Sequence, residues 1–350
     1  MNPNSIDLGL HKRYENPHTS QAGERLRSSA GKPRNGRRIV TKNKILVAVD
    51  GSAHSLEAVR YVAAVLPPAT TQVVLSHVTN ELPELFTDLG RNPLYRSKLP
   101  AIKGWVSESR NAITRFMKEA RDLLEKAGFT GTDIETKFLP QRLGVCQDLI
   151  RESYADYSAV VVGRAGVSRI KDIMFKSASV HLVSKVHHIP IIVVGGPPIS
   201  NRVMIAFDGS HEAMKGVSWV GSLLAAGSNS LVTFSLLSSN GHFWVGDKEI
   251  FLPLDVDDPL AAGEQMVGEH LEAARACLVA TGVTTERIAT RVVHLERDRA
   301  SALVETAMGC GYGTLVVGRR GLVSFIEAVF VGRVSQKVLK MADDLTVWIV

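Results

Sequence analysis

Several features that define whole classes of protein are missing from this 350-residue sequence. No apolar run approaches the roughly 18 residues that a membrane-spanning helix needs, so we expect no membrane insertion. The first thirty residues contain no apolar signal-peptide core, which leads us to expect a cytoplasmic protein. A chain of this length favours two domains.

Cysteine is scarce, and the usual catalytic and metal motifs are absent. Cys146, Cys277 and Cys310 lie far apart and form no CxxC pair, which argues against disulfides and structural zinc. The chain contains no H-E-x-x-H and no Walker lysine motif. His77 has no evident Ser or Cys nucleophile beside it, so we assign no catalytic residue and no metal site and expect a protein that is not an enzyme.

Excess positive charge is confined to the N-terminal segment. Residues 1–44 hold ten Lys and Arg side chains against three acidic ones, a balance of +7, whereas the remaining 306 residues net −1. Residues 1–42 are rich in Ser, Asn, Gly and Pro without apolar periodicity, which predicts a disordered basic tail. Few aromatic residues interleave these charges, so we expect a solvated tail rather than a nucleic-acid partner.

Strands and helices alternate from residue 45 onward. The run ILVAVDGS (45–52) predicts a buried strand that stops at an Asp-Gly-Ser turn, with Ser52 as the N-cap of a helix over 53–66. The same patterns predict strands at 73–78, 134–139, 158–163 and 189–194, and helices at 105–127, 144–155 and 177–187.

The second part of the chain repeats the first. VMIAFDGS (203–210) copies ILVAVDGS at an offset of 158, VVGRRG (316–321) copies VVGRAG (161–166) at 155, and LTVWIV (345–350) copies IPIIVV (189–194) at 156. Such similar offsets predict two equivalent domains, at 43–195 and 201–350. Alternating strands and helices predict an open parallel sheet with helices on both faces in each domain, and the short GGPP linker predicts that the domains pack together.

Each repeat places an acid and a glycine turn at strand ends, where ligands of open parallel sheets bind. Asp50 and Asp208 end the first strands, and the turns Gly163–Gly166 and Gly318–Gly321 end the fourth strands. Glycines let backbone N–H groups approach phosphates, Arg164 and Arg319 add positive charge, and a carboxylate suits an exocyclic amine. The alternative is that the glycines serve a tight turn, the arginines are solvated, and Asp and Ser only cap helices.

This order of elements and motifs over residues 44–350 resembles tandem universal stress protein domains. The resemblance implies two consecutive open parallel-sheet sandwich domains of the adenine-nucleotide α-hydrolase-like α/β fold, with strand order 3-2-1-4-5. It implies pairing of the domains through their last strands as a pseudo-two-fold dimer, here within one chain, with further homodimers left open. In the ATP-binding branch of the family the phosphate motif is G-x2-G-x9-G-[S/T].

The family's nucleotide-binding positions are only partly kept in this sequence. In the first half Asp50, Val78, Gly163 and Gly166 match, Lys176 stands in place of the third glycine, and Ser177 matches. In the second half Asp208, Leu237, Gly318 and Gly321 match, Gly332 comes one residue late, and Arg333 replaces the hydroxyl residue, for which Ser335 is the candidate substitute.

The resemblance implies a stress-response regulatory protein that binds ATP or a related adenine nucleotide, with or without Mg, in one or both halves, and that acts on an unknown regulatory partner. Two alternatives stay open. One is an interaction module of the same fold that binds no nucleotide, and the other is a slow ATPase. The segments 79–104 and 239–262 follow the second strands, and we expect them either to be lids or partner surfaces beside the crevices or to pack locally over the sheet end.

Overall fold

The computed structural model of the chain describes residues 42–79, 99–164, 182–238, 242–245, 248–251, 259–295, 298–319 and 333–350. These described residues all belong to one compact unit. The domain boundaries at 43–195 and 201–350 therefore stay a prediction, and we refer below to a first and a second half. None of the helices among the described residues is long and apolar enough to cross a membrane.

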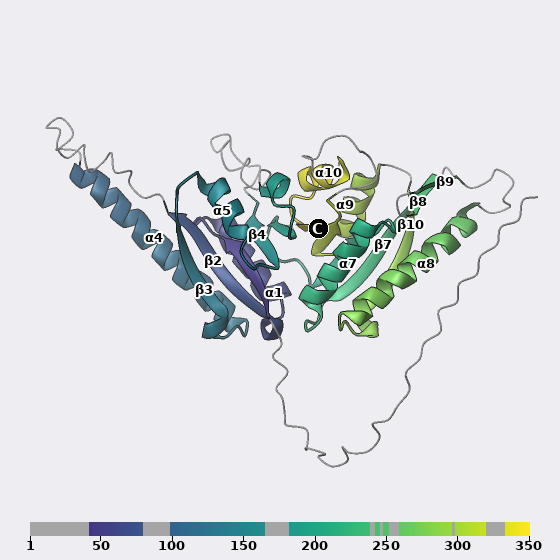
Figure 1. Cartoon of the computed structure of the whole chain (residues 1–350), viewed down its shortest axis with the longest axis horizontal. Coiled ribbons are helices and arrows are strands. Elements are labelled where there is room, and N and C mark those ends of the chain that lie inside the picture. Colours follow the sequence, from purple (N-terminus) through teal and green to yellow (C-terminus); the bar gives the residue numbers. More distant parts are fainter. Residues whose placement is uncertain are drawn as a thin grey trace, which may run out of the picture. The chain divides into compact units, whose positions relative to one another are not determined.

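The first half, drawn in purple to teal in Figure 1, contributes five strands to one sheet, in the order that the resemblance implies. They are β1 (Asn43–Ala48), β2 (Thr71–Thr79), β3 (Ile134–Pro140), β4 (Ala159–Gly163) and β5 (Ile191–Val194). All neighbouring pairs are parallel, in the order β3-β2-β1-β4-β5. The helices are α1 (Ala53–Val65), α4 (Leu99–Lys126) and α5 (Val145–Ser153), and residues 182–185 are also helical.

The second half repeats this order with its own five strands, β10-β7-β6-β11-β12, again with parallel neighbours. The strands are β6 (Arg202–Ala206), β7 (Ser230–Ser238), β10 (Ile288–Leu295), β11 (Thr314–Val317) and β12 (Thr346–Ile349). The helices are α7 (His211–Leu224), α8 (Pro259–Ala280), α9 (Arg299–Gly309) and α10 (Arg333–Met341). A separate antiparallel hairpin, β8 (His242–Val245) and β9 (Lys248–Phe251), lies in the segment 239–262, where the sequence predicts no strands.

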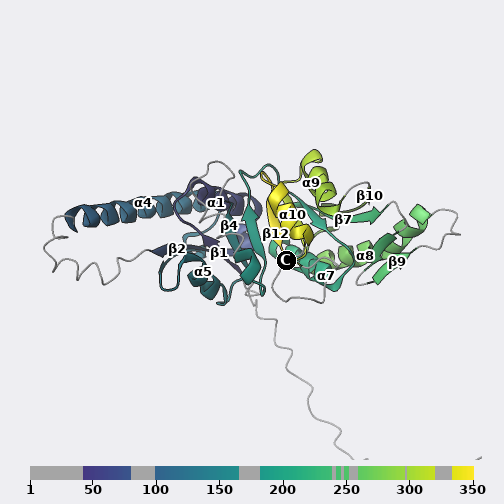
Figure 2. The ribbon, with the colours of Figure 1, turned by 90° about the horizontal axis from the view of Figure 1, so that it is seen from above.

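Strands β5 and β12 join the halves into one ten-stranded sheet. They pair antiparallel, with Trp348 beside Ile192, which confirms the expected contact between the two last strands. Figure 2 shows β12, in yellow, in the middle of the described chain. Because the joining pair is antiparallel, the carboxyl edge of the first half lies beside the amino edge of the second, and the two predicted crevices open at opposite edges of the sheet. The pseudo-two-fold relation itself stays a prediction.

Each face of the sheet carries a hydrophobic core that runs across both halves. Strand side chains alternate between faces, so Ile45 and Val47 belong to one core and Leu46 to the other. The first core packs α1 and α4 of the first half and α7 and α8 of the second on the same face. The second core includes residues of α5, α9 and α10. The two halves therefore share their cores.

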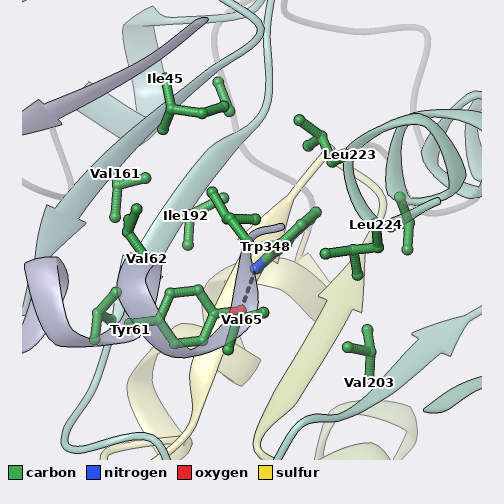
Figure 3. Close-up of a cluster of buried hydrophobic side chains, with 14 of the residues drawn as sticks. Ile45, Tyr61, Val62, Val65, Val161, Ile192, Val203, Leu223, Leu224 and Trp348 are labelled. Carbon is green, nitrogen blue, oxygen red and sulfur yellow. Dashed lines mark hydrogen bonds between the residues drawn. The ribbon is translucent and has the colours of Figure 1, made fainter. Parts of the chain in front are cut away.

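A buried hydrogen-bonded cluster, which the sequence does not reveal, closes the seam between the halves (Figure 3). Trp348 Nε1 donates to the hydroxyl of Tyr61 at 2.8 Å, the dashed line in Figure 3. That hydroxyl lies 2.8 Å from Thr314 Oγ1. Tyr61 comes from α1, whereas the other two residues come from β12 and β11. Since all three are almost fully buried, each polar group needs the others as partners.

Candidate functional site

Each Asp-Gly-Ser turn at the end of the first strand of a half has the same geometry in both halves. Asp50 Oδ1 accepts a hydrogen bond from the backbone N–H of Ser52 at 2.9 Å, and Asp208 Oδ1 accepts one from Ser210 at 3.0 Å. The intervening glycines have φ values of 84° and 76°, a conformation that disfavours other residues. One carboxylate oxygen of each acid therefore holds its own turn.

The serines of these turns cap the helices that follow, as the sequence predicts. Ser52 Oγ accepts from the N–H of Ser55 at the start of α1, and Ser210 Oγ accepts from Ala213 at the start of α7. These contacts confirm the capping interpretation for both serines. They do not exclude a ligand, because the side chain of Asp50 remains exposed.

Hydrogen bonding keeps the carboxyl group of Asp50 ionised. Partial burial would raise the pKa of Asp50, but hydrogen bonds from Ser52 and Ser55 outweigh it and hold the pKa below its usual value. Asp50 therefore carries a negative charge at neutral pH, which suits it to accept hydrogen bonds from an amine at this strand end.

Strand register identifies the apolar neighbour of each acid. Ala48 pairs with Ser76, so two residues further on Asp50 lies beside Val78, which is 8% exposed. In the second half Ala206 pairs with Phe234, which places Leu236 beside Asp208. Continued in the same register, Leu236 corresponds to Val78, whereas the predicted Leu237 is the next residue along β7. The role of Leu237 stays a prediction.

Gly163 lies where a side chain does not fit. A Cβ atom added there would come within 2.3 Å of the carbonyl oxygen of His54, in the first turn of α1. The end of β4 thus lies directly against the helix that begins at the Asp50 turn, and β4 is also the neighbour of β1, which leads into that turn. That the acid and the glycine turn face one crevice stays a prediction. The same contact supports the interpretation that this glycine is needed for backbone packing.

Arg164 is buried and reaches into the second half. Its Nη1 donates to the carbonyl oxygen of Ala342 at 2.6 Å and lies 3.4 Å from Asp343 Oδ1. Desolvation lowers the pKa of Arg164, an effect that the charge of Asp343 opposes. The alternative that Arg164 is solvated is therefore wrong. Its guanidinium group contacts the second half at the boundary between the halves.

Arg319 has the reciprocal arrangement. Its Nη1 donates to the carbonyl oxygen of Val183 in the first half. Backbone contacts match too, since Arg164 N–H donates to Val194 and Arg319 N–H donates to Val350. Each turn arginine is thus bonded through its backbone to its own half and through its side chain to the other.

Ser335, the proposed substitute for the missing hydroxyl residue, lies at the predicted glycine turn. Its Oγ donates to the carbonyl oxygen of Gly318 at 2.7 Å, and its side chain is buried. The hydroxyl proton of Ser335 therefore holds the end of β11, and only its lone pairs remain for another donor.

Several predicted positions at the phosphate end lie outside the described residues. These are Gly166, Lys176 and Ser177 of the first half and Gly321 and Gly332 of the second. Their roles stay predictions. The structure brings together the acid, the apolar neighbour and the first glycine of the first half, and it turns both arginines toward the seam.

His77 has a structural partner rather than a catalytic one. Its Nδ1 lies 2.9 Å from the carbonyl oxygen of Val49 and so donates a proton to it, while its ring meets Phe138 edge-on at 6.3 Å between centroids. Among the residues that the structure describes, no three His, Cys, Asp or Glu side chains gather into a metal-binding group.

Known structures show the fold, although neither family models nor curated proteins match the sequence. A universal stress protein from Archaeoglobus fulgidus DSM 4304 is 15% identical, covers 88% of this chain and 98% of its own, and superposes with a TM-score of 0.55. A putative universal stress protein from Pseudomonas aeruginosa UCBPP-PA14 is 13% identical over 88% of this chain and 93% of its own, with a TM-score of 0.52. Both matches extend over the two halves, and the chain therefore has the fold of the universal stress proteins.

Proposed function

We propose that the chain is a stress-response regulatory protein that binds ATP or a related adenine nucleotide at the carboxyl edge of one or both halves. The observation that carries the proposal is the contact between the end of β4 and the first turn of α1, which brings the Asp50 turn and the glycine turn to one place. That place is the edge where open parallel sheets bind ligands.

The base end of the first crevice suits an adenine. Asp50 is ionised and exposed, and it accepts hydrogen bonds, as the exocyclic amine of adenine requires. Val78 beside it offers an apolar wall. A carboxylate beside an apolar surface is a common way to orient a planar base.

The phosphate end rests on fewer described residues. Arg164 and Arg319 each donate through Nη1 to a carbonyl group of the other half, so these N–H groups are not available to a phosphate. Phosphate binding would then depend on backbone N–H groups of the glycine turns and on Lys176, with Mg as a further source of positive charge. Ser335 does not contribute in this arrangement, because its hydroxyl already donates to the carbonyl oxygen of Gly318. We further propose that the protein is cytoplasmic, that one or both halves bind the nucleotide, and that the protein acts on a regulatory partner.

The engagement of both arginines also favours the rival function, an interaction module of this fold that binds no nucleotide. Chromatography of nucleotides released from denatured, freshly purified protein separates the two. Adenine nucleotide at one or two per chain supports binding. Empty protein that also fails to take up added ATP in native mass spectrometry favours the interaction module.

The acids provide matched variants for this experiment. Asp50→Asn and Asp208→Asn keep an oxygen for the Ser N–H but lose the charge that an amine would meet, so the double variant should retain about tenfold less nucleotide. Asp133→Asn is the control, because this acid lies at the amino end of β3, away from the crevice. Phosphate release by the wild type that exceeds release by the double variant would point to the ATPase alternative.

A further inference from the structure

We infer that α10 links the glycine turns of the two halves, so that a change at one turn is transmitted to the other. The contacts that carry this inference exist without any ligand. Its regulatory meaning, communication between two nucleotide crevices, rests on the proposed function.

The amino end of α10 holds the turn of the second half. Ser335, in the first turn of this helix, donates from its hydroxyl to the carbonyl oxygen of Gly318 at 2.7 Å. With 1% of Ser335 exposed, water does not replace this bond. A displacement of Gly318 would therefore displace the amino end of α10.

The carboxyl end of the same helix is held by the turn of the first half. Arg164 Nη1 donates at 2.6 Å to the carbonyl oxygen of Ala342, directly after α10, and lies near Asp343. A cation is favoured at a helix carboxyl end, because carbonyl groups there lack helical partners. Ser335 and Ala342 are seven residues apart, so the two attachments are separated by about 10 Å along the helix.

The first-half attachment continues to the crevice. Gly163, beside Arg164, lies against the backbone of His54 and Ser55, and Ser55 N–H is capped by Ser52. A ligand that pressed on the Asp50 turn or the glycine turn would thus act on Arg164. Close packing of this kind transmits small displacements, because a well-packed interior does not absorb them.

A reciprocal contact exists on the other side of the seam. Arg319 of the second-half turn donates to the carbonyl oxygen of Val183, in the helical stretch 182–185 of the first half. Each turn therefore holds a helix of the opposite half, and the arginines that resemble phosphate ligands in the sequence serve the seam.

Amide hydrogen exchange of the full-length protein without added nucleotide tests the link. In Ser335→Ala, the Arg164 amide, which donates to Val194, should exchange about tenfold faster although it lies in the other half. In Arg164→Gln, the amides at the end of α10, such as that of Ala342, should exchange faster by a similar factor.

Matched controls separate the link from general destabilisation. Ser222→Ala removes an exposed hydroxyl that bonds within α7, and Arg275→Gln removes an exposed cation of α8. Neither should change exchange at Arg164 or Ala342. Faster exchange that stays within the substituted half, or that appears equally in the controls, would overturn the inference.

Addition of ATP to the wild type then distinguishes the two proposals. No change in exchange at either turn would count against nucleotide binding, while the Ser335→Ala and Arg164→Gln results would still decide the link. In Asp50→Asn the first crevice should bind nucleotide more weakly. We still expect added ATP to slow amide exchange at both turns of this variant, because nucleotide in the second crevice would act on the first-half turn through α10.

Discussion

Close packing of β4 against α1 requires a glycine at the end of β4. Gly163→Ala would bring a methyl group within 2.3 Å of the His54 carbonyl oxygen, so β4 or α1 must shift. We expect a loss of about 1–3 kcal/mol in the free energy of unfolding, measured by chemical denaturation. Gly104→Ala, in α4 with open space around it, is the control and should leave stability unchanged or slightly raised.

The Tyr61 hydroxyl is the shared partner of two other buried polar groups between the halves. Tyr61→Phe leaves Trp348 Nε1 and Thr314 Oγ1 without this partner in a buried site, and we expect a loss of about 1–3 kcal/mol. Urea denaturation followed by tryptophan fluorescence measures it. Tyr154→Phe removes a hydroxyl from an exposed side chain and should have little effect, and equal losses for the two variants would contradict the role of the seam cluster.

At the scale of elements, α9 and α10 are joined by an ion pair. Asp298 caps α9 and lies 3.0 Å from Lys337 of α10. Hydrogen bonds from Ser301 first and Lys337 next lower the pKa of Asp298 to about 2. Because the folded-state pKa is below the ordinary value of about 3.9, the contribution is present above pH 4 and is lost as the pH falls toward 2.

A carbon-detected NMR titration of the Asp298 carboxyl group tests this directly. We expect a midpoint well below that of an ordinary aspartate, and Lys337→Gln should move it upward. A midpoint near 3.9 in the wild type would show that the ion pair and the cap do not form in solution.

Most elements could be predicted from the sequence because their signals are local. Ser52 before an amphipathic stretch gives α1 its start, and the apolar runs before Asp50 and Asp208 give β1 and β6. Helix α4 begins at Leu99, earlier than the predicted residue 105, because its first turns lack a clear apolar stripe. The β8–β9 hairpin was not predicted, although the two residues between its strands, Gly246 and Asp247, are a typical hairpin-turn sequence.

Contacts between residues far apart in the chain could not be predicted from the sequence. The acid and the glycine of the first crevice were predictable, since both follow apolar strands, and the resemblance to universal stress proteins implies that these strands are neighbours. The partners of Arg164 and Arg319 could not be predicted. A cation in a glycine turn suggests a bound anion, and nothing in the local sequence indicates carbonyl groups of the other half as the partners. Tyr61 and Trp348 are 287 residues apart, and no spacing rule joins them.

At the scale of the whole molecule, the shared cores predict a single unfolding transition. Residues of α1, α4, α7 and α8 contribute to one core, and β5 and β12 connect the halves by a strand pair. We therefore expect thermal unfolding curves from tryptophan fluorescence and far-ultraviolet circular dichroism to coincide. Two separate transitions would show that the halves are stable independently.

Calorimetric titration of ATP measures whether the acid turns bind an adenine nucleotide. We expect saturable binding to nucleotide-free wild type at one or two sites per chain. We expect affinity weaker by about tenfold for the Asp50→Asn, Asp208→Asn double variant and unchanged affinity for Asp133→Asn. Absence of binding to the folded wild type, or equal affinity in all three proteins, would contradict nucleotide binding at the acid turns.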